Sequence, residues 1–193
     1  MNRIEIIQSY INKYSYKNYL EIGVEGGHCF TAVKCENKTG VDPDKSSKAT
    51  VHKTSDDFFA ENKEKFDIIF IDGLHHSDAV EKDIANSLEC LSEGGTVLMH
   101  DCLPTNEFMQ LIPLTTQDEW TGDTWKAYVK CRQERSDVSM FVINDDHGVG
   151  VIRKGFQNKL NISVDINYQN FEIYKQEWMN VISVEDFINH LKN

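Results

Sequence analysis

Residues 19–30 read YLEIGVEGGHCF, and the order of residue types in this stretch decides the fold. An apolar run over 19–22 meets Gly23, two more glycines follow at Gly26 and Gly27, and residues of helical character come next. This order predicts a strand, a glycine-rich turn and a helix. Gly23 lacks the Cβ that would keep a ligand away from the backbone. The free N–H groups and the positive dipole end of the helix point at the same place, so the turn suits a nucleotide-like ligand with anionic or hydroxyl groups.

The spacing of the glycines separates this turn from a dinucleotide-binding one. A dinucleotide turn begins with a glycine directly after the strand, but here Glu21 has that place, giving E-x-G-x-x-x-G across Glu21, Gly23 and Gly27. The turn resembles motif I of the class I S-adenosylmethionine (SAM) methyltransferases. The resemblance implies that the acid interacts, often through water, with the cationic methionine end of SAM. The alternative is a tight turn in an α/β domain that binds no cofactor.

The size and charge of the chain limit its partners. With 193 residues we expect one domain, 1–193, with an N-terminal helix within 1–16 and a helical tail over 155–193. The net charge of −11 opposes nucleic acid as a partner. No apolar run approaches the roughly 20 residues of a membrane span. Five cysteines without a C-x-x-C pair indicate reduced thiols, so we expect a cytoplasmic protein with no membrane partner.

A second acid follows the glycine turn at the distance expected of a nucleotide-binding fold. Asp42 comes 21 residues after Glu21, at the tip of a short predicted strand. In Rossmann-like folds an acid about 20 residues beyond the turn accepts hydrogen bonds from ribose hydroxyls. The alternative for Asp42 is a turn residue before Pro43. We expect the helix after the glycine turn to end near Cys35, a third strand over 49–53, and helical structure with surrounding loop over 106–118.

Ser55 precedes a predicted helix over 57–64. The resemblance implies an adenine-contacting loop here, and Ser55 matches its polar position loosely. The alternative is that Ser55 only caps the helix, because a Ser or Thr before an acidic first turn is an N-cap pattern.

Two strands end in titratable residues. The run 66–73, FDIIFIDG, is nearly continuous in apolar residues, as expected of a central parallel strand covered on both faces. It ends in Asp72, and His75 and His76 follow. After a predicted helix over 77–91, the strand 96–101 ends in His100 and Asp101. Ligands of open α/β sheets sit beyond the carboxyl ends of the strands, so chemistry is expected here.

The region 20–102 as a whole resembles one group of class I methyltransferases. The group has a pattern close to F-D-x-I-F-I-D-G-x-H, then a helix with an Asp, a Gly-Gly pair and a strand ending in His-Asp. A G-D-x-W-K element, here within 120–126, adds to the resemblance. It implies an α/β fold, a Rossmann-like, doubly wound sheet of seven strands in the order 3-2-1-4-5-7-6, with the last strand antiparallel and helices on both faces. Apolar runs at 139–144 and 148–154 around Asp-Asp-His predict the closing hairpin.

The two strand-end acids can converge, because neighbouring strands lie about 4.8 Å apart. We expect Asp72 and Asp101 to be catalytic, with His76 or His100 as general base. Two converging carboxylates also suit Mg²⁺, so Asp72 and Asp101 are candidate ligands of Mg²⁺ or another divalent cation. In the metal-dependent sugar O-methyltransferases that this region resembles, the second strand ends in two successive acids, where this chain has His100 and Asp101. That difference favours a metal that accepts imidazole, such as Mn²⁺, Fe²⁺ or Zn²⁺, or His100 as base without a metal.

The sequence therefore predicts a SAM-dependent methyltransferase that methylates a hydroxyl of a small-molecule or sugar acceptor. The residues expected to bind SAM are Glu21, Gly23, Gly27, Asp42, Ser55 and Asp72. Two alternatives remain: a non-catalytic SAM- or nucleotide-binding module, and a metal-dependent hydrolase or oxygenase on the same sheet. The tail is expected to cover the sheet or a neighbouring subunit, which leaves a homodimer open.

Overall fold

The computed structural model describes residues 1–115 and 119–192, in which seven strands form one sheet. The strands are β1 (Asn18–Ile22), β2 (Asn37–Val41), β3 (Phe66–Ile71), β4 (Leu91–Met99), β5 (Val138–Ile143), β6 (Val149–Lys154) and β7 (Val181–Ile182). Their order is β2-β1-β3-β4-β6-β5-β7. Only β6 among these runs antiparallel to its neighbours. The Rossmann-like α/β class predicted from the sequence is confirmed.

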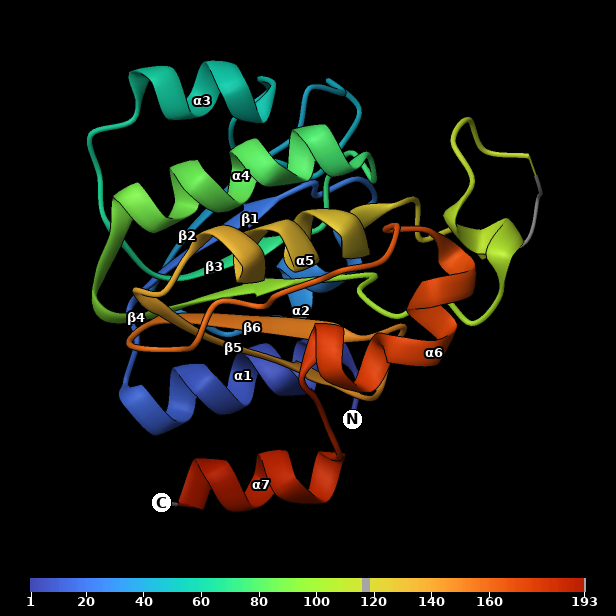
Figure 1. Ribbon diagram of the computed structural model, residues 1–193. Coiled ribbons are helices and arrows are strands. Elements are labelled where there is room, and N and C mark those ends of the chain that lie inside the picture. Colours follow the sequence, from blue (N-terminus) through green and yellow to red (C-terminus); the bar gives the residue numbers. More distant parts are fainter. Residues whose placement is uncertain (116–118, 193) are drawn as a thin grey trace.

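Helices cover both faces of the sheet (Figure 1). They are α1 (Arg3–Tyr14), α2 (His28–Ala32), α3 (Ser55–Glu61), α4 (Ser77–Cys90), the 3₁₀ turn η1 (Glu107–Gln110), α5 (Thr124–Glu134), α6 (Tyr168–Met179) and α7 (Val184–Lys192). In Figure 1, α1 and α7 lie below the sheet, and α3, α4 and α5 lie above it. Asn2 and Glu5 cap the start of α1 reciprocally, so this helix begins at a defined place next to the strand ends.

The core consists of two clusters, one on each face of the sheet. Leu20, Ile69 and Val97 belong to the cluster that packs under α4 and α5, while Tyr19 and Ile68 belong to the one that packs on α1 and α7. Successive side chains of a strand point to opposite faces. Both faces are covered, which explains why β3 is apolar at nearly every position.

The sheet differs from the prediction at both edges. The strand expected over 49–53 is reduced to a single bridge between Val51 and Val41, because polar residues flank Val51 and leave little apolar surface to bury. The order 3-2-1-4-5-7-6 therefore lacks its first member. The opposite edge gains β7, which pairs with β5 inside a tail that was expected to hold only helices.

Helix boundaries differ in three places. The helix after the glycine turn ends at Ala32, earlier than expected, because Val33 adopts an extended backbone. Helix α3 covers Ser55–Glu61 rather than 57–64. The helix expected within 106–118 is only η1, and residues 116–118 lie outside the described part of the chain.

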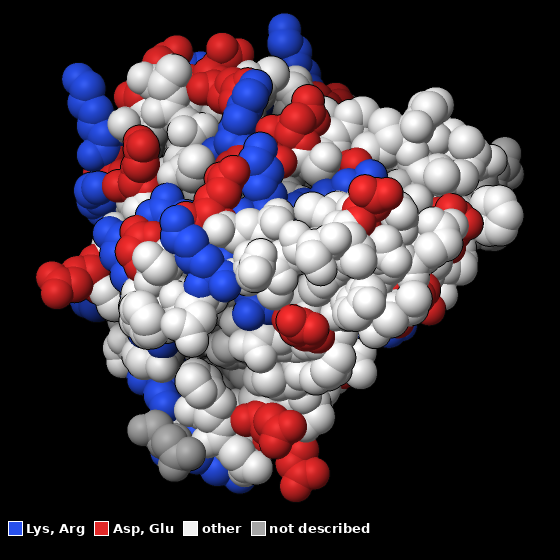
Figure 2. Space-filling model, viewed as in Figure 1, with Lys and Arg blue, Asp and Glu red and all other residues white. Residues whose placement is uncertain are grey.

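The surface of the view in Figure 2 carries no continuous basic field: Lys and Arg are interspersed with Asp and Glu on its left and upper parts, and its right part is nearly uncharged. Within residues 1–115 and 119–192, no helix has the length and apolarity needed to cross a membrane.

Candidate active site

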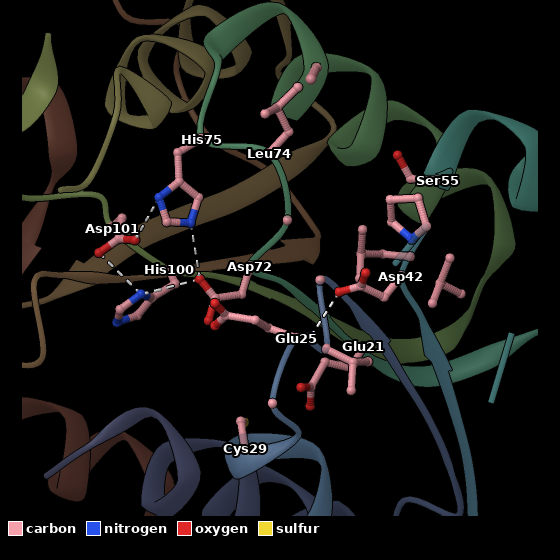
Figure 3. A pocket seen from close by; sticks show the side chains of 18 of the residues that line it. Glu21, Glu25, Cys29, Asp42, Ser55, Asp72, Leu74, His75, His100 and Asp101 are labelled. Atoms are coloured by element: carbon pink, nitrogen blue, oxygen red, sulfur yellow. Dashed lines mark hydrogen bonds and ion pairs between the residues drawn. The ribbon is translucent and has the colours of Figure 1, made fainter. Parts of the chain in front are cut away.

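A cavity of about 1050 Å³ opens beyond the carboxyl ends of the parallel strands. Its lining includes all the residues expected at the site except His76: Glu21, Gly23, Gly27, Asp42, Ser55, Asp72, His100 and Asp101. Small-molecule pockets measure roughly 300–1,000 Å³, so this one has room for a cofactor and an acceptor together. Figure 3 shows Asp42 and Ser55 at one end, called the cofactor end below after the role expected from the sequence, and Asp72, His75, His100 and Asp101 at the other, called the acceptor end.

The glycine turn brings two strand ends together. Gly23 has φ +87°, and a Cβ on it would lie 2.1 Å from the carbonyl oxygen of Asp72. Only glycine allows this approach. A Cβ on Gly26 would meet no atom within 4 Å, so the turn leaves space on the cavity side. The backbone of β1 is thereby held against the end of β3 while the cavity stays open above it.

Asp42 follows β2 and is largely buried at the cofactor end of the cavity. Its Oδ2 accepts a hydrogen bond from the backbone N–H of Glu25 at 2.7 Å, and its Oδ1 accepts one from the N–H of Asp44 at 2.8 Å. A carboxylate has about four acceptor positions. The remaining ones on Asp42 can take a pair of ligand hydroxyls, which fits the ribose role expected from the sequence.

Glu21 lies on β1, fully buried at the floor of the cavity. The hydroxyl of Tyr19 donates a hydrogen bond to its Oε2. Burial raises the pKa of Glu21 to about 7, although the bond from Tyr19 opposes the shift and the charge of Asp72 adds to it. The Glu21 side chain therefore titrates close to neutral pH, and a cationic ligand beside it would favour the carboxylate.

Ser55 is the first residue of α3 and lines the cavity beside Asp42. The side chain that caps this helix is that of Thr54, whose Oγ1 accepts the N–H of Asp57 at 3.1 Å. The alternative that Ser55 serves as the cap is therefore wrong, and its side chain instead forms a hydrogen bond with the carboxylate of Asp83.

His100 lies at the centre of the acceptor end, in ion-pair contact with three carboxylates. Its Nδ1 is 3.1 Å from Asp101 Oδ1 and 3.4 Å from Asp72 Oδ1, and its Nε2 is 3.4 Å from Asp146 Oδ1. Burial lowers the pKa of His100, but the contacts with the three carboxylates outweigh it and raise the pKa to about 11. At neutral pH His100 is thus an imidazolium, a charge state that opposes the role of general base expected for it.

Asp72 remains ionised in the same cluster. Burial alone would raise the pKa of Asp72, but the contacts with His100 and His75 and the charge of Arg3 outweigh it and hold the pKa well below its usual range.

The histidine that reaches the cavity from the loop after β3 is His75. Its Nε2 lies 3.5 Å from Asp72 Oδ1, its Nδ1 lies 3.3 Å from Asp101 Oδ2, and its ring stacks on Trp120. Burial lowers the pKa of His75, but the contact with Asp72 and the charge of Asp101 raise it above its ordinary value.

His76, one of the two histidines expected from the sequence to act as base, is the N-cap residue of α4. It is not among the described residues that line the cavity. The loop turns into the helix at this residue, so the structure puts the imidazole of His75, one position earlier, between the two acids.

Two residues of the acceptor end, Arg3 and Asp146, have no counterpart in the sequence prediction. Arg3 starts α1, and its Nη1 donates to Asp72 Oδ2 at 2.9 Å. Its Nη2 donates to Asp146 Oδ1 at 3.2 Å, and its Nε and backbone N–H donate to Asp146 Oδ2 at 3.1 and 2.6 Å. One sequence signal was available for Asp146: β5 runs parallel to β4 in the predicted sheet, so the turn after β5 reaches the same edge.

A glycine and a threonine near the start of α5 fix the two loops of the acceptor end. A Cβ on Gly122, which has φ +59°, would lie 1.8 Å from the carbonyl oxygen of His75, and the N–H of Asp123 donates to that oxygen at 3.2 Å. The hydroxyl of Thr124 donates to the carbonyl oxygen of Asp101, itself a non-glycine residue with φ +59°. The G-D-x-W-K element therefore fixes the backbone of the two loops that carry His75 and Asp101.

The spacing of the ligand atoms in this cluster suits a divalent cation, but the basic side chains that already contact the carboxylates do not. Ligand atoms of Asp72, His75 and Asp101 lie within 4.8 Å of one another. The carboxylate oxygens of Asp72 and Asp101, however, already contact Arg3, His75 or His100. Mg²⁺ prefers anionic and neutral oxygen ligands and keeps several waters. Among the described residues, the donor set as arranged therefore does not fit the ion that the sequence suggested.

Comparison with known proteins agrees with this geometry. Residues 20–102 match the model of a family described as a methyltransferase domain. No curated protein sequence matches the chain significantly. The chain is similar in fold to an O-methyltransferase from Bacillus cereus in complex with SAH, at 15% identity and TM-score 0.59 over 79% of this chain and 80% of that one.

Two further solved structures share the arrangement. TomG, an O-methyltransferase from Streptomyces achromogenes involved in tomaymycin synthesis and bound to SAM, has 15% identity and TM-score 0.56 over 77% of this chain and 78% of that one. The MycE methyltransferase of the mycinamycin pathway, in complex with Mg, SAH and mycinamycin VI, has 16% identity and TM-score 0.50 over 83% and 50%. Residues 20–102 thus match a methyltransferase-domain model, and the chain shares the Rossmann-like fold of these O-methyltransferases, as its motifs predicted.

Proposed function

We propose that this protein transfers the methyl group of SAM to a hydroxyl of a small-molecule or sugar acceptor. The observation that supports this most directly is the single cavity, which has Glu21 and Asp42 toward one end and the Asp72–His75–Asp101 group at the other. One end offers hydrogen-bond acceptors to a nucleoside, and the other offers acid–base groups to a hydroxyl.

The cofactor end of the proposal rests on four residues. When bound, SAM supplies the electrophilic methyl group. The free acceptor positions of Asp42 take the ribose hydroxyls, and the carboxylate of Glu21 faces the cationic methionine end. Ser55 lies where the adenine would reach the wall, and Gly23 keeps the β1 backbone close to the ligand.

At the acceptor end the chain must orient the hydroxyl and remove its proton. Methyl transfer needs the acceptor oxygen in line with the sulfur–carbon bond, so positioning carries much of the rate. His75 accepts the proton in its unprotonated form, and Asp72 and Asp101 on either side stabilise the imidazolium that forms, which is why the pKa of His75 is raised above its ordinary value. A positioned base contributes typically ~10²–10⁴-fold. His100 stays protonated and keeps the two acids in place.

We also propose that the protein works in the cytoplasm on a partner that is not nucleic acid. The excess of acidic residues supports the second part. The five cysteines, all free in the structure, support a reducing compartment.

Calorimetric titration with SAM tests the cofactor end. We expect micromolar binding by the wild type and a loss of about 100-fold or more in Asp42→Ala, because charge-assisted hydrogen bonds contribute roughly 1.5–3 kcal/mol each. The matched control is Asp44→Ala, which removes a neighbouring acid that is exposed and does not line the cavity. Absence of heat at millimolar SAM would exclude the proposal.

The acceptor is sought with methyl-labelled SAM. Sugars, nucleotide sugars and phenols are screened by mass spectrometry for transferred label, with and without EDTA. The proposal expects label on a hydroxyl oxygen. SAM binding without any transfer across these classes would favour the non-catalytic binding module instead.

A further inference from the structure

Arg3 is a permanent cation inside the acidic cluster. Its guanidinium contacts Asp72 through Nη1, and Asp146 binds the same guanidinium through Nε and Nη2. A guanidinium does not lose its proton in a protein, so its charge is independent of pH. The contact with Asp72 spans 69 positions of sequence and that with Asp146 spans 143. Both contacts therefore form only in the folded chain.

The carboxylates of Asp72, Asp101 and Asp146 need positive charge close to them. Ligand atoms of Asp72 and Asp101 lie within 4.8 Å of each other. Two like charges at that distance repel each other, and the repulsion is stronger in a partly buried site than in water. Asp146 adds a third negative charge on the far side of His100. A site of this composition is stable only with cations that belong to the protein or with a bound metal.

The position of Arg3 is fixed from two sides. The backbone N–H of Arg3 donates to Asp146 Oδ2 at 2.6 Å, so both the main chain and the side chain of this residue bind one carboxylate. Helix α1 behind it is anchored by Ile6, Ile7 and Tyr10, which are fully buried against the sheet. A divalent ion at Asp72 would have to displace a guanidinium that also binds Asp146 through Nε and Nη2.

We propose that the guanidinium of Arg3, rather than a divalent ion, balances the acidic cluster and holds the Asp72 carboxylate in place, so that methyl transfer at this site needs no metal. Arg3 is a positioning residue, since it acts on the acceptor through Asp72. The part of the inference that concerns methyl transfer rests on the proposed function. The part that concerns metal binding can be tested without it.

The first test measures metal binding directly. Wild type, Arg3→Met and the control Arg135→Met are treated with EDTA, dialysed and titrated calorimetrically with Mg²⁺ and with Mn²⁺, and thermal unfolding is recorded with each ion. Arg135 is a matched control because it also pairs bidentately with an Asp, on the surface. Met keeps much of the length of the Arg side chain and removes its charge.

We expect no binding heat and no shift of the unfolding midpoint for wild type and Arg135→Met. Arg3→Met should bind Mn²⁺ at least about tenfold more tightly than wild type, which equals ~1.4 kcal/mol, because it leaves Asp72 without its fixed cation. Micromolar binding of either ion by wild type, or Arg3→Met that binds no better than wild type, overturns the inference. If Arg3→Met does not fold, the wild-type titration alone still tests the inference. Asp146→Asn, which removes one carboxylate that holds the guanidinium, provides a second variant, with a smaller expected gain in metal affinity.

The second test uses methyl transfer once an acceptor is found. Wild type should keep its activity in EDTA, and Arg3→Lys should retain a part of it because the cation remains. Arg3→Met should lose activity and regain some with Mn²⁺, a rescue that a merely structural role of Arg3 would not produce. Wild type that binds SAM but loses activity in EDTA refutes the inference alone, whereas wild type that binds neither SAM nor metal refutes the proposed function and leaves the charge balance by Arg3 standing.

Discussion

The two ends of the cavity are built in different ways. At the cofactor end, Glu21 and Asp42 are held by hydrogen bonds from a tyrosine hydroxyl and from backbone N–H groups. At the acceptor end, Asp72 and Asp101 are held by the basic side chains of Arg3, His75 and His100. The acids of the cofactor end can therefore pair with a cationic ligand, whereas the acids of the acceptor end are already paired with basic side chains of the protein.

This difference has a consequence for chemistry. The raised pKa of Glu21 shows that its negative charge is poorly compensated within the protein, so binding of a sulfonium cofactor relieves an existing cost. The lowered pKa of Asp72 shows the opposite condition. Binding at one end and proton transfer at the other should therefore respond separately to mutation.

The largest effect that separates the ends is expected from His75→Gln. Removal of the base should lower kcat by ~10²–10⁴-fold, while the dissociation constant of SAM stays within about twofold because the side chain lies at the other end. Transfer of labelled methyl and calorimetry measure the two quantities. His76→Gln is the matched control and should change kcat by less than about threefold, as a substitution outside the cavity. Equal losses in both variants would contradict the assignment of His75.

A smaller but still large effect is expected from Gly122→Ala. The new Cβ would collide with the carbonyl oxygen of His75, so the free energy of unfolding should fall by about 3 kcal/mol or more. Gly94→Ala is the control: Gly94 also has positive φ, at +73°, but its Cβ would meet nothing within 4 Å, and the cost should be only ~1–2 kcal/mol. Denaturant unfolding gives both values. If the two variants lose the same stability, the contact between the loops is looser than described.

The smallest effect concerns pH at the cofactor end. Glu21 has a pKa of about 7 in the folded protein against an ordinary value of 4.5, so the folded state binds more protons between these two values. The stabilising contribution of Glu21 is therefore fully present below about pH 4.5 and is lost as the pH rises through 7. Relative to Glu21→Gln, wild type should lose roughly 2–3 kcal/mol between pH 5 and 8.

Denaturant unfolding of wild type and Glu21→Gln across this pH range provides the measurement. The comparison cancels the other titrating groups, among them Asp83, whose pKa burial raises to about 6. Parallel stability curves for the two proteins would show that Glu21 is already charged in the folded state, and the contrast between the ends would disappear.

The sequence predicted the parts of the molecule that depend on local pattern. Strand β3, helix α4 and the glycine turn lie where the apolar periodicity and the glycines put them, since both faces of the sheet are buried and Gly23 makes a contact that excludes a side chain. Glu21 and Asp42 were found by spacing, because each follows or ends a strand at a set distance from the turn.

The acceptor end was less predictable for a physical reason. Arg3 and Asp146 meet Asp72 only through tertiary packing, and no local pattern marks such contacts. The choice between His75 and His76 depends on where α4 begins and on the ring of Trp120, which stacks on His75. Because the loop turns into α4 at His76, the imidazole of His75 and not that of His76 lies in the cavity.

The backbone of Asp101 limits which residues this position can hold. A φ of +59° is tolerated readily by glycine, asparagine and aspartate and poorly by longer side chains. Of these three only aspartate carries a negative charge. Glutamate would preserve the charge but strain the main chain, and asparagine would preserve the main chain but lose the charge, so no other common amino acid satisfies both demands at this point of the fold.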